Sequence, residues 1–169
     1  MKKFFSYGVV AIAAFAMVSC GNKAGNAGAE KDSTATEQVA EAPSTFAENE
    51  FFSVTGPDGW EVKADDTWKK VGMEDVNSTE TFKPKINIRV YEDKKLQEKI
   101  DYLLKCGDTY KKGDDLKIGN FTFTTVRGSN KLNYCYTELE NGRLLEVETV
   151  YIEPEAEVVK PVVESIKIK

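Results

Sequence analysis

Residues 21–47 set the first limit on the fold, because they contain hardly any apolar side chains. The segment reads GNKAGNAGAEKDSTATEQVAEAPSTFA, with no aromatic residue before Phe46 and almost no branched aliphatic one. Such a composition cannot bury enough apolar surface to offset the entropy lost on ordering. We therefore predict a flexible tether here, with a root-mean-square reach of about 30 Å, and one folded domain over residues 48–169.

The segment before the tether has the pattern of a leader peptide. Two lysines precede the apolar run Phe4–Val18, which is too short for a membrane span and is typical of a secretory signal. The run ends in Met17-Val18-Ser19-Cys20, which resembles the lipobox of bacterial lipoproteins, with methionine where that family expects an aliphatic residue. The resemblance implies that a lipid is attached to the Cys20 thiol and that cleavage follows Ser19. The alternative is an ordinary secretory signal with a chance cysteine.

This resemblance divides the chain into a signal peptide (1–19), a lipidated cysteine with its tether (20–47) and a globular domain (48–169). One acyl chain binds a membrane only marginally, whereas two or more hold a protein durably. We therefore expect the lipid to anchor the protein in the bacterial cell envelope. Gly21 replaces the aspartate that retains some lipoproteins in the inner membrane, which favours the outer membrane.

Composition excludes several classes of function. The chain has no histidine, so it can form neither a Ser-His-Asp or Cys-His nucleophile pair nor an HExxH zinc site. It has 23 basic and 28 acidic side chains, a balance that gives no reason to expect nucleic acid as a partner. We expect a non-enzymatic protein without cofactor or metal, whose partner is a protein or a small ligand.

The first half of the domain shows three strand patterns and a helix pattern. FFSVT (51–55) and WEVKA (60–64) flank the turn sequence GPDG, which predicts a hairpin, with Trp60 as a buried anchor. KINIRVYED (85–93) alternates between apolar and polar residues, as a half-buried strand does. Residues 94–105 carry one apolar stripe, which predicts a helix that covers the sheet.

Two hairpins can be aligned from their turns. A Gly119-Asn120 loop pairs Ile118 with Phe121 and Leu116 with Phe123, so that four apolar side chains share a face. An Asn141-Gly142 loop pairs Glu140 with Arg143. Continued outward, that pairing places Tyr134, Tyr136, Leu145 and Val147 on the buried face, and Cys135, Glu146 and Glu148 on the opposite face.

The C-terminal segment predicts a helix followed by a strand. The helix starts near Pro154, carries a stripe of four valines and is interrupted or kinked at Pro161. SIKIK (165–169) reads as a short last strand with its isoleucines inward. The predicted fold class is therefore α+β, an antiparallel sheet of about six or seven strands with helices packed on it.

The sequence FSVTGPDGW, the strand INIRVY and the ending ESIKI together resemble the Mog1/PsbP-like fold over residues 48–169. The resemblance implies an α/β/α sandwich that serves binding or assembly, as in accessory proteins of photosystem II and a Ran-binding factor. It carries over no catalytic motif. A cystatin-like or a lipocalin-like fold is the competing interpretation, the second less favoured because two helices are predicted.

Two cysteines and several carboxylates remain as candidate chemistry. Cys106 and Cys135 could form a disulfide in an oxidising compartment, and the sequence leaves this open. Recurring acids could act as general acid and base in an envelope hydrolase or could bind a cation, but the alternation favours a solvated strand face. These acids are Asp114, Asp115, Glu138, Glu140, Glu146 and Glu148.

A long polar stretch, residues 65–84, combines aromatic side chains with lysines, and we treat it as a candidate recognition loop. Its candidate contact residues are Trp68, Lys69, Lys70 and Phe82. The alternative is that Trp68 and Val71 belong to a further strand. The sequence thus predicts a lipid-anchored binding or assembly-accessory module, with a carboxylate-based envelope hydrolase or a cation-binding module as alternatives.

Overall fold

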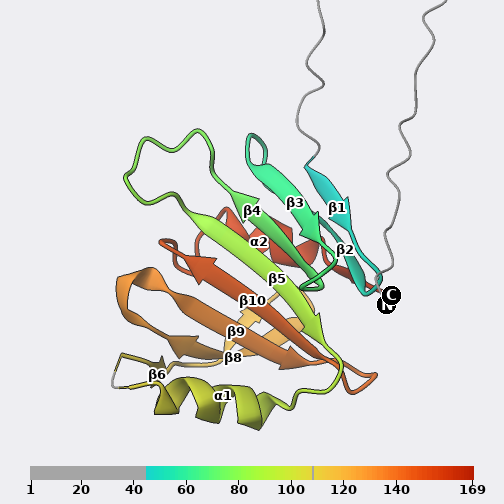
Figure 1. Cartoon of the computed structure of the whole chain (residues 1–169), viewed down its shortest axis with the longest axis vertical. Coiled ribbons are helices and arrows are strands. Elements are labelled where there is room, and N and C mark those ends of the chain that lie inside the picture. Colours follow the sequence, from blue (N-terminus) through green and yellow to red (C-terminus); the bar gives the residue numbers. More distant parts are fainter. Residues whose placement is uncertain (1–44, 108) are drawn as a thin grey trace, which may run out of the picture. The chain divides into compact units, whose positions relative to one another are not determined.

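The computed structural model describes residues 45–107 and 109–169, so Cys20 and most of the predicted tether lie outside the described residues (Figure 1). The domain is a sheet-rich α+β fold in which every strand pair is antiparallel. An 8-stranded sheet follows the order β3-β4-β5-β10-β9-β8-β6, and β7 pairs with β8 off this path. Its strands are β3 (Glu61–Asp65), β4 (Lys70–Glu74), β5 (Lys85–Tyr91), β6 (Lys111–Lys112), β7 (Leu116–Ile118), β8 (Phe121–Arg127), β9 (Asn133–Glu138) and β10 (Leu144–Val150).

A 3-stranded sheet, β1-β2-β11, lies beside it and is built from β1 (Phe46–Glu48), β2 (Phe52–Thr55) and β11 (Lys167–Ile168). The helices are α1 (Leu96–Lys105), α2 (Val159–Glu164) and a 3-10 turn, η1 (Ser129–Lys131). The predicted six or seven strands are too few: β4 lies within the stretch treated as a candidate recognition loop, and β1 and β6 are only three and two residues long. The first strand also begins at Phe46, two residues inside the segment predicted as tether.

The alternation in β5 decides which face of the large sheet is apolar. Ile86, Ile88 and Val90 are buried on one face, whereas Asn87 and Arg89 point to the other. This confirms the predicted half-buried strand. The apolar face packs against α2 and the small sheet in one continuous core, which includes Phe52, Val54, Trp60, Val159, Val162 and Val163. Full burial of such a side chain contributes about 1.5–3 kcal/mol.

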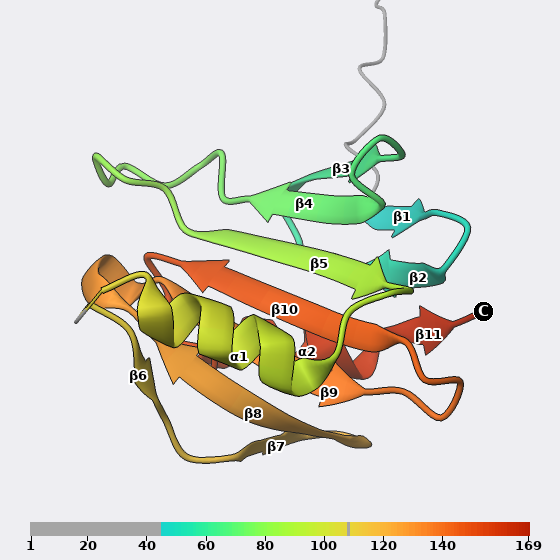
Figure 2. The same cartoon turned by 60° about the horizontal axis from the view of Figure 1, so that its bottom comes forward.

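Helix α1 covers the opposite face over only part of its width (Figure 2). Ile100 and Leu103 pack against Val126, Tyr136 and Leu144, which come from strands β8, β9 and β10. Figure 2 shows strands β3 and β4 beyond the helix, and no helix or strand of the described residues lies over them on this face. The predicted helix over residues 94–105 is therefore confirmed, and it leaves the β3–β4–β5 part of the sheet open.

The β9–β10 hairpin is one residue out of the predicted register. Its loop has three residues, 140–142, because Leu139 N–H donates to the Arg143 carbonyl at 2.8 Å and Gly142 takes the left-handed conformation at φ 77°. Asn-Gly is compatible with this longer loop as well as with the two-residue one. Since a slip of one residue exchanges the two faces of a strand, Cys135 joins Leu145 and Val147 in the core, while Tyr134 and Tyr136 share a face with Glu146 and Glu148.

The predicted hairpin of residues 51–55 and 60–64 is wrong, although its turn is present. Trp60 N–H donates to the Pro57 carbonyl at 3.2 Å. However, β2 pairs with β1 and β11, whereas β3 pairs with β4. The turn thus passes the chain from one sheet to the other, and Trp60, only 7% exposed, is buried where they meet, as predicted.

Other expectations are confirmed with small changes. The Gly119-Asn120 hairpin has the predicted pairs, Ile118 with Phe121 and Leu116 with Phe123. The last strand forms as β11, with Ile166 buried. Helix α2 begins at Val159, later than predicted, so Pro161 lies in its first turn, where a missing N–H breaks no helical bond.

Candidate functional site

The open part of the large sheet is a polar surface built from cross-strand rows. One row runs Lys63–Gly72–Asn87–Glu148 across β3, β4, β5 and β10. The next row runs Asp65–Lys70–Arg89–Glu146. Both rows begin on β3, away from α1, and end on β10, where Glu146 contacts Lys99 of α1. The polar rows thus extend from exposed strands to the strand that packs against α1.

At the covered end, Glu146 holds a buried ionic network. Its side chain is enclosed, and its carboxylate lies 3.4 Å from Lys99 Nζ and 3.7 Å from Arg89 Nη1. Tyr91 OH donates to Glu146 Oε1 at 3.1 Å and accepts from Arg89 at 2.7 Å and from Lys99 at 2.9 Å. Burial, and then the charge of Glu146, raise the pKa of Tyr136. The prediction that Glu146 faces solvent is wrong, because α1 covers this face of β10 and Lys99 of α1 contacts the carboxylate.

Glu148 is also partnered. Asn87 Nδ2 donates to Glu148 Oε2 at 2.8 Å. Burial first, and the charge of Glu148 second, raise the pKa of Tyr134. Each of the two glutamates is thus tied to side chains of the sheet or of α1, and this arrangement does not favour the pair of free acids that a hydrolase needs. Among residues 45–107 and 109–169, no three His, Cys, Asp or Glu side chains are grouped so that they could hold a metal ion.

At the open end, the β3–β4 turn presents Trp68 to solvent. Its indole is 64% exposed, yet the backbone beneath it is fixed. Trp68 N–H donates to Asp65 Oδ1 at 3.1 Å, and Lys69 takes the left-handed conformation with φ 51°. An exposed tryptophan on a fixed turn is a ready contact for a ligand.

Lys69 ties this turn to the rest of the domain. Its Nζ lies 3.0 Å from Glu92 and 3.4 Å from Glu50, and it stands 4.7 Å from the centre of the Phe51 ring. The hydrogen bond to Glu92 raises the pKa of Lys69. Lys69 therefore holds the turn in place, and the carboxylates of Glu50 and Glu92 compensate its charge.

Two hollows adjoin on this surface. The first, which we call the Trp68 cavity, has a volume of about 310 Å³ and is lined by residues 67–69 and 89–94. The second, the Gly72 hollow, also has about 310 Å³ and is lined by Lys63, Lys70, Gly72, Glu74, Lys85 and Asn87, among others. They meet at the cross-strand pair of Lys70 and Arg89, since Lys70 lines one and Arg89 the other.

The structure brings together three of the four predicted recognition residues. Trp68 and Lys69 line the Trp68 cavity, and Lys70, the first residue of β4, lines the Gly72 hollow. Phe82 lies elsewhere, in the loop that follows the other end of β4, where it stacks on Tyr151 with ring centres 4.8 Å apart. Of the two residues that the alternative interpretation assigned to a further strand, Val71 belongs to β4, whereas Trp68 lies in the turn before it.

Sequence reasoning missed Asn87, Arg89 and Tyr91 as site residues. They form the polar face of β5, and the alternation in 85–93 gave that face correctly. The alternation could not identify β10 as the neighbour of β5, because this pairing joins residues more than fifty positions apart.

The disulfide that the sequence left open is not formed. Both thiols are free; Cys106 is exposed after α1, and Cys135 is buried. Cys135 belongs to the core on the α2 side of the sheet, whereas α1 lies on the other side, so the sheet separates them. Burial raises the pKa of the Cys135 thiol to about 12.

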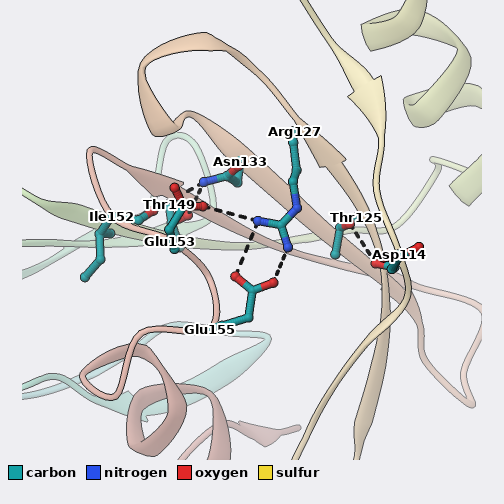
Figure 3. Close-up of polar contacts among 8 residues, drawn as sticks. All are labelled: Asp114, Thr125, Arg127, Asn133, Thr149, Ile152, Glu153 and Glu155. Carbon is teal, nitrogen blue, oxygen red and sulfur yellow. Dashed lines mark hydrogen bonds and ion pairs between the residues drawn. The ribbon is translucent and has the colours of Figure 1, made fainter.

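A second polar cluster fixes the segment that leads into α2 (Figure 3). Arg127 bonds to both carboxylate oxygens of Glu155 and to Glu153 Oε2 at 3.2 Å. Burial opposes it, but the hydrogen bonds from Arg127 hold the pKa of Glu155 below its ordinary value. Asn133 Nδ2 donates to Thr149 Oγ1 and to the Ile152 carbonyl, each at 3.3 Å. All these groups satisfy one another, which is the pattern of a structural brace.

No protein-family model matches the chain, and no curated protein matches it. A crystal structure of a protein from Bacteroides thetaiotaomicron VPI-5482, at 1.50 Å resolution, is similar to part of it. The two chains are 15% identical, with a TM-score of 0.42, and the match covers 70% of this chain and 45% of the other. This chain therefore spans less than half of that protein, and a likeness of this extent carries no argument about fold or function.

Proposed function

We propose that this chain is a lipid-anchored lipoprotein of the bacterial cell envelope and that its folded domain is a non-enzymatic binding module. The anchor is Cys20, supported by the apolar run before it and by Met17-Val18-Ser19-Cys20. The outer membrane is favoured by Gly21. No helix among residues 45–107 and 109–169 is both long and apolar enough to cross a bilayer.

The observation that carries the binding role is the preformed pair of hollows beside Trp68. A large aromatic side chain is held exposed on a fixed turn, next to two hollows of about 310 Å³ each. Such a volume lies at the lower end of the range for ligand pockets. The glutamates behind the hollows are already paired, so they act as supports for this surface.

The arrangement of layers supports a Mog1/PsbP-like architecture as part of the same proposal. Helix α1 packs on one face of the large sheet, and α2 with the small sheet packs on the other. An α/β/α sandwich of this kind would serve binding or assembly in the envelope, at the end of the tether.

The anchor is tested by mass spectrometry of the protein isolated from its own envelope, with Cys20→Ala as the control. We expect the mature chain to begin at an acylated Cys20. A chain that begins at Met1, or an unmodified Cys20, would overturn the anchor.

The binding role is tested by crosslinking in intact envelopes, comparing the wild type with Trp68→Ala. The control is Tyr102→Ala, which removes an equally exposed aromatic side chain from α1. We expect a crosslinked envelope component that is lost in Trp68→Ala and retained in Tyr102→Ala. Equal crosslinking in all three proteins would remove the site from the proposal.

A further inference from the structure

We infer that the Trp68 cavity and the Gly72 hollow together bind a neutral oligosaccharide, an inference that rests on the proposed binding function and names its ligand class. Four features of this surface support it: an aromatic platform, a near balance of acidic and basic side chains, free hydrogen-bonding groups on the floor, and a length greater than one sugar ring.

The platform is the Trp68 indole. Sugar rings carry one face of C–H groups, and these pack against an aromatic plane, whereas their hydroxyl groups point outward to polar partners. Trp68 is exposed, and the bonds of Asp65 and Lys69 hold its turn before any ligand arrives. Little order is then lost on binding, which favours affinity.

Four of the six basic side chains that line the hollows are paired with carboxylates, whereas Lys70 and Lys94 form no ion pair among the described residues. Lys63 lies 2.7 Å from Glu61, Lys85 lies 2.6 Å from Glu74, and Lys69 lies 3.0 Å from Glu92. Arg89 is directed to Tyr91 and Glu146. The two linings together hold five acidic and six basic side chains. Such a balanced surface attracts neither a polyanion nor a polycation strongly over distance, and a neutral polar ligand suits it.

The floor offers hydrogen-bonding groups and room. The Asn87 amide nitrogen is bound to Glu148, and among the described residues no donor bonds to Asn87 Oδ1, which can therefore accept from a hydroxyl group. Gly72 lies beside it, and a Cβ on Gly72 would stand 3.1 Å from Asn87 Oδ1. The absence of a side chain at position 72 keeps this acceptor accessible.

The two hollows are long enough for more than one sugar unit. From Lys70 to Gly72 strand β4 advances two residues, about 7 Å at the strand rise, and Trp68 lies in the turn two residues before Lys70. The cavities meet at Lys70 and Arg89, so a ligand stacked on Trp68 can continue along β4. This geometry fits a short linear glycan better than a single ring.

The chain contains a built-in reporter for this test, because it has two tryptophans and one of them is buried. Trp60 is 7% exposed and Trp68 is 64% exposed. In a Trp60→Phe variant, Trp68 supplies the tryptophan fluorescence. The full-length protein, in a detergent without a sugar headgroup, is titrated with cellotetraose, maltotetraose, mannotetraose and chitotetraose, with heparin and a lysine tetrapeptide as charged competitors.

We expect at least one neutral tetrasaccharide to shift the Trp68 emission in a saturable way. The same sugar should reduce the quenching of this emission by acrylamide. Binding is also measured by calorimetry in protein that keeps Trp60. Trp68→Ala should weaken the affinity for that tetrasaccharide at least tenfold, and Tyr102→Ala should leave the affinity unchanged. Gly72→Thr should lower the affinity for the tetrasaccharide far more than the affinity for the corresponding monosaccharide. Because Trp68 is exposed, its removal tests binding without disturbing the core.

Two results would overturn the inference. One is an unchanged Trp68 emission with every neutral glycan. The other is a response to heparin or to the lysine peptide that exceeds the response to the glycans. Either could occur while the Trp68-dependent crosslink in the envelope persists, so failure of the ligand class is distinguishable from failure of the binding role.

Discussion

Arg89 lies directly opposite Glu146 across the β5–β10 ladder, and its Nη1 stands 3.7 Å from the Glu146 carboxylate. Lys99 approaches the same carboxylate from α1 at 3.4 Å. One enclosed carboxylate therefore compensates two cations, one from the sheet and one from the helix. Glu146 is the point at which α1 is joined to the polar face of the sheet.

Replacing Glu146 with glutamine should therefore destabilise the domain. The substitution leaves two partly buried cations beside each other without a counter-charge, and breaking a buried ion pair from one side is strongly unfavourable. We expect a loss of about 2–4 kcal/mol in urea unfolding. Glu61→Gln, which breaks the exposed pair with Lys63, should cost at most about 1 kcal/mol. Equal losses in the two variants would contradict the role of Glu146.

The stability of the domain should fall as the pH rises above about 9. Burial raises the pKa of Cys135 from 9.0 to about 12 and also raises the pKa of Tyr136 above 10.0. The folded state thus keeps protons that the unfolded chain releases, so the stabilisation is complete below the unfolded pKa values and is lost above them. Urea unfolding between pH 7 and pH 11 measures this slope. Cys135→Val should make it shallower, and an unchanged slope would speak against the buried thiol.

The parts of the fold that could be predicted from the sequence are those that depend on residues close together in the chain. The alternation in β5 and the Gly119-Asn120 hairpin involve residues a few positions apart, and both are correct. The Asn141-Gly142 hairpin shows the limit. The same dipeptide fits loops of two and of three residues, and the choice between them moved Cys135 into the core and placed Tyr134 and Tyr136 beside Glu148 and Glu146.

The candidate site was found in part for the same reason. Trp68, Lys69 and Lys70 are neighbours in the chain, so one polar segment drew attention to all three. Phe82 belongs to the same stretch, but strand β4 lies between it and Trp68. The two aromatic side chains are therefore at opposite ends of the strand. Asn87 and Arg89 reach the site through strand pairing, which no local pattern records.

Gly142 should be sensitive to substitution even though it has space around it. Nothing lies within 4 Å of a Cβ added there, but its φ of 77° belongs to a conformation that side chains disfavour. Gly142→Ala should therefore lower the free energy of unfolding by about 1–2 kcal/mol. Gly142→Asn should lose less, since asparagine tolerates the left-handed conformation. A neutral Gly142→Ala variant would show that the loop relaxes to a conformation in which residue 142 has a negative φ.

Arg127 should control the order of the segment that leads into α2. Its guanidinium reaches Glu153 and both carboxylate oxygens of Glu155 at once (Figure 3), a geometry that lysine cannot reproduce although it keeps the charge. We expect Arg127→Lys to speed hydrogen exchange at the Ala156 and Val159 amides, which donate to the Glu153 and Ala156 carbonyls. The β5 amides should be unaffected, because they lie in the centre of the sheet. Exchange that rises equally in β5 would mean that Arg127 supports global stability, and unchanged exchange at Ala156 would mean that the backbone turns hold the segment by themselves.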